Sequence, residues 1–183
     1  MTYRKWQITV ASTILLASLQ AEAQVNDADG LRHLENQRLE LDKRTASITD
    51  RHAFDAYAKA TEGTDIFPLS KLSPAARARF TESLRFNARG LTTFDYSDLV
   101  RELGAADIQR VLKPFGFQHL VAVLPDIRVL SEEDHRVLQT LEATRRLRCS
   151  VGEHCNETDY PAYKCASHAT CEESSVHTCT SNC

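Results

Sequence analysis

The chain has 183 residues, with 22 basic and 25 acidic side chains and a formal net charge of −3 at neutral pH. Nucleic acids and anionic membranes attract cations, so this balance disfavours a protein that binds either of them through charge. All six cysteines lie in the last 35 residues, and this contrast divides the chain into two parts.

The first 23 residues have the features of a secretory signal peptide. Arg4 and Lys5 supply a positive start, a mostly apolar run follows, and residues 21–23 form an A-x-A cleavage site. We expect cleavage between Ala23 and Gln24 by the secretion machinery. The apolar run is shorter than the roughly 20 residues that span a bilayer, which disfavours a stable membrane anchor. The short alanine-rich signal is of a bacterial style, so the expected location is the periplasm or the extracellular medium.

Residues 24–148 predict a cysteine-free body of several short helices. A polar, largely exposed helix is expected over residues 27–43. A second helix is expected to begin at a cap formed by Thr49 or Asp50 and to run to about Thr61.

Start and stop signals also divide the middle of the body. Ser73 supplies a capping oxygen and Pro74 suits a first helical turn, so a helix is expected from there towards Gly90. Another helix is expected over residues 96–103, with Asp95 as its cap. Three further segments complete the body: a short helix from residue 106 or 107 to Pro114, a buried helix or strand over 120–124, and a helix that begins with a capping box at Ser131.

The body has enough apolar side chains for one small core. All seven phenylalanines lie between residues 54 and 117 and are expected to pack with leucines and valines, although a ligand pocket among the rings is an alternative. The predicted fold class is mainly α: a small multi-helix body followed by a disulfide-rich, loop-dominated C-terminal module.

Residues 149–183 are this cysteine-rich module, and they contain few aliphatic side chains. A segment this short cannot build its own core, and an even number of cysteines in an exported chain predicts disulfides, each contributing about 2–4 kcal/mol. The spacing alone does not choose their pairing. The predicted disulfide residues are Cys149, Cys155, Cys165, Cys171, Cys179 and Cys183.

A metal site is the alternative use of these cysteines. His154, His168 and His177 stand near them, and thiolate and imidazole ligands suit zinc or copper. The segment contains no Cys-x-x-Cys motif, so we prefer disulfides and expect no cofactor. One lysine against five acidic residues further disfavours an attack on membranes driven by charge.

Arg145, Arg146 and Arg148 stand immediately before the first cysteine. They predict a processing site that would release the cysteine-rich module from the body. The alternative is an ordinary helix C-terminus, where cations complement the helix dipole.

No familiar catalytic motif occurs in the sequence. His52 lies near Asp50 and Asp55, and His135 follows Asp134, but such pairs arise often by chance on charged helices. We therefore expect no enzyme activity.

The layout of signal, helical body and cysteine-rich tail resembles the bacteriocin fulvocin C-related proteins. The residues that carry the resemblance are 149–183, together with helix starters such as Leu72-Ser73-Pro74. The resemblance implies a secreted antimicrobial precursor whose C-terminal module recognises an unidentified protein or cell-surface target. The alternative is an unprocessed periplasmic or extracellular binding module, such as an inhibitor or immunity protein.

Overall fold

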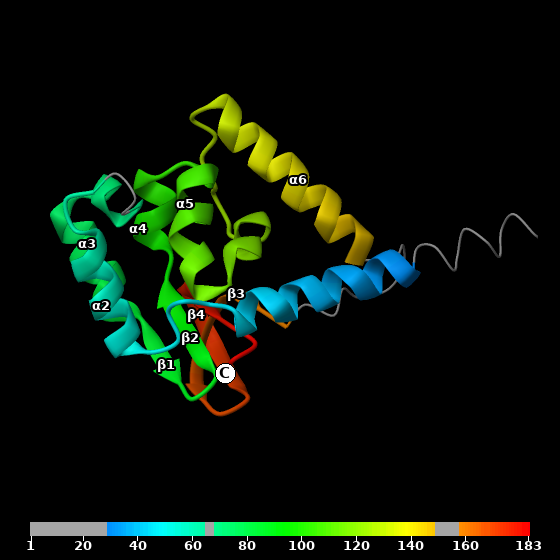
Figure 1. Cartoon of the computed structure of the whole chain (residues 1–183), viewed down its shortest axis with the longest axis horizontal. Coiled ribbons are helices and arrows are strands. Elements are labelled where there is room, and N and C mark those ends of the chain that lie inside the picture. The colour runs from blue at the N-terminus through cyan, green and yellow to red at the C-terminus, as the bar shows by residue number, and fades with distance from the viewer. Residues whose placement is uncertain (1–28, 65–67, 149–157) are drawn as a thin grey trace, which may run out of the picture.

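The computed structural model describes residues 29–64, 68–148 and 158–183, and it combines helices with one antiparallel sheet. This mixed architecture corrects the mainly α prediction. The described part of the cysteine-rich module forms two long strands instead of the expected loops. Figure 1 shows α4, α5 and α6 above the sheet and α2 and α3 to its left, with these last two strands reaching lowest.

Helices make up most of the body. Residues 29–44 are helical and mostly exposed, as expected from their polar sequence. The other helices, in chain order, are α2 (Arg51–Thr61), η1 (Pro68–Lys71), α3 (Pro74–Ser83), α4 (Ser97–Glu102), α5 (Ala105–Leu112), η2 (Lys113–Phe115), η3 (Gln118–Ala122) and α6 (Glu132–Arg148). None of the helices in these described ranges is long and apolar enough to cross a membrane.

The sheet has four strands in the order β1-β2-β4-β3, and every neighbouring pair is antiparallel. Its strands are β1 (Arg85–Asn87), β2 (Gly90–Asp95), β3 (Tyr160–Ser167) and β4 (Thr170–Cys179). Strand β2 pairs with β4, with Phe94 opposite Thr178 and Thr93 opposite Cys179. The body and the C-terminal segment therefore share one sheet, although the paired strands β2 and β4 are about 75 residues apart in sequence.

The helix predicted to run towards Gly90 ends at Ser83 instead. Arg51 donates hydrogen bonds to the carbonyl oxygens of Thr81 and Leu84, at 3.0 and 2.9 Å, and so satisfies acceptors that a longer helix would use. The chain then forms the β1–β2 hairpin, in which Gly90 has φ of 121°, a backbone conformation that disfavours other residues.

Residues 120–124 were expected to form a buried helix or a strand, and they contribute to the short 3₁₀-helix η3. Leu120 and Val121 are almost fully buried there, so the expectation of burial is confirmed. Strand formation is excluded because no described strand includes these residues.

The core of the body surrounds α5 and contains most of the phenylalanines. Ile108 and Leu112 of α5 are completely buried, and α5 packs against η3 and α6. The Phe80 and Phe94 rings meet edge to face with centroids 6.1 Å apart, which joins α3 to the sheet. The predicted packing role is confirmed for the buried phenylalanines 54, 80, 94, 115 and 117, whereas Phe67 lies outside the described residues.

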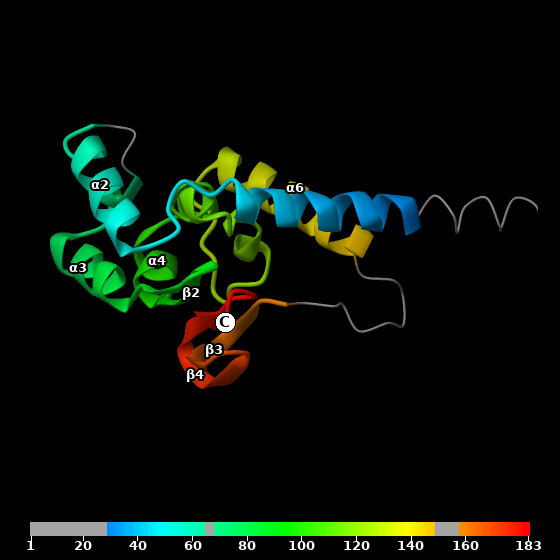
Figure 2. The ribbon, with the colours of Figure 1, turned by 60° about the horizontal axis from the view of Figure 1, so that its bottom comes forward.

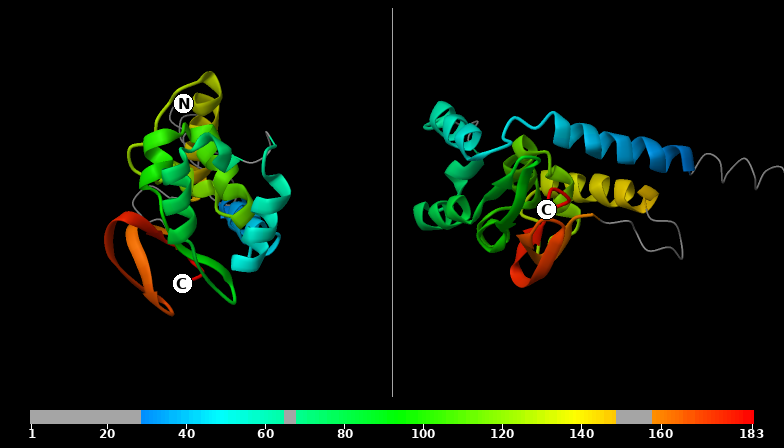
Figure 3. Two further views of the ribbon diagram at one scale, coloured as in Figure 1. Left: turned by 90° about the vertical axis from the view of Figure 1, so that its left-hand side faces the viewer. Right: turned by 90° about the horizontal axis from the view of Figure 1, so that it is seen from below.

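The C-terminal hairpin, which we define as residues 158–183, protrudes from the body. Figure 2 shows β3 and β4 below the helices, and Figure 3 shows the same hairpin standing apart from α2, α3 and α6 in two further views. Within residues 29–64, 68–148 and 158–183, strand β3 pairs only with β4, so it is an edge strand of the described sheet.

Candidate functional site

Two disulfides close the C-terminal hairpin. Cys165 is bonded to Cys183 and Cys171 to Cys179, with Cα atoms 5.7 and 6.0 Å apart. These bonds involve four of the six residues predicted to form disulfides, and they indicate a non-reducing compartment. Cys149 and Cys155 lie outside the described residues.

The hairpin departs from a regular ladder near its base. The register shifts between Pro161 and Tyr163, opposite residues 174–177 of β4, and Ala162 has φ of 65°. Such bulges bend a strand and redirect its side chains. Here the rings of Tyr160 and Tyr163 meet edge to face, with centroids 6.2 Å apart, and Tyr160 is 46 % exposed. The irregular base of β3 therefore presents an aromatic pair on the surface.

Body side chains reach the hairpin backbone and fix its position. Thr93 donates a hydrogen bond from Oγ1 to the carbonyl of Thr178 at 2.7 Å. The hydroxyl of Tyr96 donates to the carbonyl of Ser175 at 2.9 Å. Burial and the charge of Asp95 raise the pKa of Tyr96, so this hydroxyl stays a donor.

A buried imidazole–carboxylate pair makes a second connection. Nε2 of His119, in η3, lies 2.9 Å from Oδ2 of Asp159, and the side chains are only 7 % and 9 % exposed. The carboxylate accepts, so Nε2 carries the proton, and the other oxygen of Asp159 accepts the Ser181 N–H at 2.7 Å. The hairpin is thereby held at its beginning, along β4 and near its end. The sequence does not predict this pair, because nothing local marks two residues that are 40 positions apart.

The hairpin surface is polar. Lys164 lies 3.9 Å from Glu172 across the strands, with Glu173 exposed beside it. Two of the histidines that could have bound a metal lie in different surroundings. His168 is exposed in the turn, and Nδ1 of His177 lies 2.8 Å from Oγ of Ser174. His154 lies outside the described residues.

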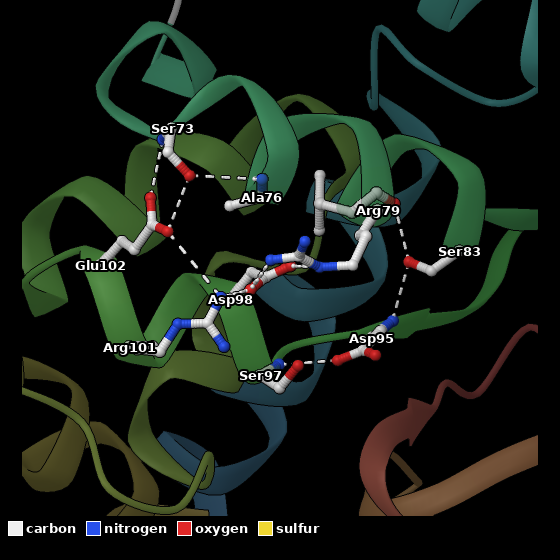
Figure 4. Close-up of polar contacts among 10 residues, drawn as sticks. Ser73, Ala76, Arg79, Ser83, Asp95, Ser97, Asp98, Arg101 and Glu102 are labelled. Atoms are coloured by element: carbon white, nitrogen blue, oxygen red, sulfur yellow. Dashed lines mark hydrogen bonds and ion pairs between the residues drawn. The ribbon is translucent and has the colours of Figure 1, made fainter.

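A second polar cluster joins α3 to α4, far from the cysteines in sequence (Figure 4). The buried carboxylate of Asp98 accepts two hydrogen bonds from Arg79, both at 2.9 Å, and it also contacts Arg101. Glu102 accepts from the backbone N–H and hydroxyl of Ser73, and these bonds lower its pKa. The charged side chains of this cluster pair with one another, so the cluster acts in helix packing.

An open groove of about 380 Å³ lies where the end of the first helix meets α2, α5 and the 3₁₀-helices. Its charged walls are Asp42, Arg110 and Lys113, and Arg110 is already engaged by Asp107 and Glu133. The remaining lining residues are Thr45, Ser47, Tyr57, Pro114 and Gln118.

The predicted processing residues Arg145, Arg146 and Arg148 lie in the last turns of α6. Arg146 is 84 % exposed and lies 3.8 Å from Glu142. Processing there stays a prediction, as does signal cleavage at Ala23 and Gln24, which lie outside the described residues. The aspartates beside the two histidines considered for catalysis have structural roles. Asp50 caps α2, and Asp134 donates its N–H to the Ser131 hydroxyl that caps α6.

No protein-family model matches this chain, and neither a curated protein nor a solved structure matches it. The resemblance to bacteriocin precursors therefore stays a prediction.

Proposed function

We propose that this chain is an exported binding protein whose C-terminal hairpin recognises a protein or cell-surface target while remaining attached to the body. The proposal joins the predicted signal peptide with the hairpin geometry. A bacteriocin-like protein would be the case in which that target lies on a competing bacterium.

The observation that carries the proposal is the form of the hairpin itself. Two disulfides and the pairing with β2 limit its motion, so little conformational entropy is lost when it binds. Strand β3 has a single neighbouring strand among the described residues, and Tyr160 adds an exposed aromatic side chain. Aromatic anchors on a rigid support are typical of protein-binding surfaces.

The contacts with the body favour an intact protein over a released peptide. A peptide freed from the body would lose β2 as a partner and would expose Thr178 and Cys179, which are completely buried. It would also separate Asp159 from His119. A charged or polar group that loses its partner but stays buried lowers the stability of the fold by about 1–3 kcal/mol.

Site-specific photo-crosslinking tests this function. A photoreactive residue replaces Tyr160 or Lys164 in the exported full chain, and the matched control replaces the exposed Gln139 of α6. We expect a discrete adduct from the hairpin positions and none from Gln139. Equal labelling from both surfaces, or none from the hairpin, would contradict recognition by this hairpin.

Mass spectrometry of the exported product tests whether the hairpin acts on the intact body. We expect a single polypeptide that contains both α6 and the hairpin, without cleavage after Arg148. A product that begins near Cys149 would replace this proposal with the precursor hypothesis.

A further inference from the structure

The two disulfides of the hairpin lie against each other. The Sγ atoms of Cys165, Cys179 and Cys183 all lie within 4.8 Å of one another, although they belong to two different bonds. The fourth sulfur, that of Cys171, is bonded to Cys179. Cys171 is also the cross-strand partner of Cys165 in the β3–β4 ladder. Four sulfurs therefore form one compact cluster.

Hydrogen bonds that do not involve sulfur hold the ends of this cluster. The backbone N–H of Cys183 donates to the carbonyl of Thr180 at 2.9 Å, and the N–H of Ala169 donates to the carbonyl of Cys183 at 2.8 Å. The hydroxyl of Thr180 donates to the carbonyl of Leu91 at 2.6 Å. These bonds hold the C-terminus beside the hairpin without involving sulfur.

We propose that the reduced chain binds one zinc ion through Cys165, Cys171, Cys179 and Cys183. Zinc–thiolate bonds of about 2.3 Å in a tetrahedron place the sulfurs about 3.8 Å apart. The two sulfurs of each opened disulfide must therefore separate by about 1.8 Å, and clustered sulfurs that are not bonded to each other approach by at most about 1 Å. Cys179 and Cys183 are buried, which suits a closed structural site with four protein ligands.

The disulfides and the metal exclude each other. A dithiol reductant gives each protein disulfide two electrons and two protons and becomes a disulfide itself, and zinc then displaces the protons from the four thiols. In an oxidising compartment, two acceptors of the disulfide class each take two electrons from the thiolates and become dithiols, two protein disulfides form and zinc is released as the divalent ion. The same hairpin thus has a zinc-bound state before oxidation and a disulfide-bonded state afterwards.

Zinc titration of the full chain tests this site. The protein is reduced with a phosphine under anaerobic conditions, and zinc binding is measured by competition with a chromophoric chelator. We expect one tightly held zinc per reduced chain and none in the oxidised chain. Cobalt(II) in place of zinc should give the visible absorption of a tetrahedral thiolate site. A reduced chain that retains no zinc overturns the proposal, whatever the variants do.

Two paired variants locate the site among the six cysteines. The double variant Cys179→Ser and Cys183→Ser should bind zinc at least about 100-fold more weakly, because two of four ligands are lost. The matched control, Cys149→Ser with Cys155→Ser, should keep the affinity of the unmodified chain. The opposite pattern would assign zinc to other cysteines and overturn the proposed ligand set.

Discussion

Asp159 connects the C-terminal hairpin to the body, and its charge makes that connection depend on pH. Burial alone would raise the pKa of this carboxyl, but the hydrogen bond and charge of His119, with the Ser181 N–H, lower it overall. A carboxyl with a lowered folded pKa stabilises the fold above its unfolded pKa, which is about 3.9. That stability is lost as the pH falls through the lower folded value.

We therefore expect Asp159→Asn to destabilise the protein by about 1–3 kcal/mol at neutral pH, because His119 loses a charged acceptor in a buried place. The free-energy difference from the unmodified protein should shrink as the pH falls from about 5 towards 2. Urea unfolding at several pH values measures it. A difference that stays constant over this range would show that the charge of Asp159 adds nothing.

At the scale of elements, one carboxylate fixes the ends of two helices. Asp134 forms the predicted capping box with Ser131, whose hydroxyl lies 2.8 Å from Oδ2. Its other oxygen accepts the N–H of Ala106, in the first turn of α5, at 2.7 Å. Burial would raise the pKa of Asp134, but these hydrogen bonds lower it. Sequence analysis identified the capping box because its residues are three apart, whereas the bond to α5 spans 28 residues.

Gly104→Ala tests the close packing around this carboxylate. A Cβ at Gly104 would lie 2.6 Å from one oxygen of Asp134, which would displace the cap of both helices. We expect a loss of about 1–3 kcal/mol in the free energy of unfolding, measured with urea. Gly30→Ala is the matched control, because nothing lies within 4 Å of its Cβ, and it should be neutral or stabilising by up to about 1 kcal/mol. Equal effects at both positions would contradict this account.

Local signals predicted helices better than strands. Asp50 and Ser73 cap α2 and α3 as expected, since the capping side chain lies three residues from the amide that it accepts. Strand β2 was missed although Thr92, Thr93 and Phe94 favour strands and follow a turn at Gly90. β4 was missed because its partner β2 is distant in sequence, and its own polar residues resemble a loop.

At the scale of the whole molecule, the cysteine-rich segment and the body depend on each other. The sequence correctly indicated that this segment contains disulfides. The sequence did not show that β2 supplies a partner strand. Cysteine content and charge change near residue 148, which suggests two separate units, but the sheet contains strands from both sides of that boundary. For the same reason the candidate site was only partly predictable: four cysteines were found, but the tyrosine pair and the connection through His119 were not.

This dependence predicts that opening the disulfides in the zinc-free protein loosens the body at β2. Without its restrained partner β4, strand β2 keeps only the short β1 beside it, and an isolated two-stranded hairpin is marginally stable in water. Hydrogen exchange measured by mass spectrometry should show faster exchange in residues 90–95 after reduction in the presence of a zinc chelator. The internal control is residues 108–112 of α5, which pack against η3 and α6 in the core of the body and should stay protected. If residues 90–95 keep their protection, β4 remains on the sheet through hydrogen bonds alone, and the disulfides serve only the outer part of the hairpin.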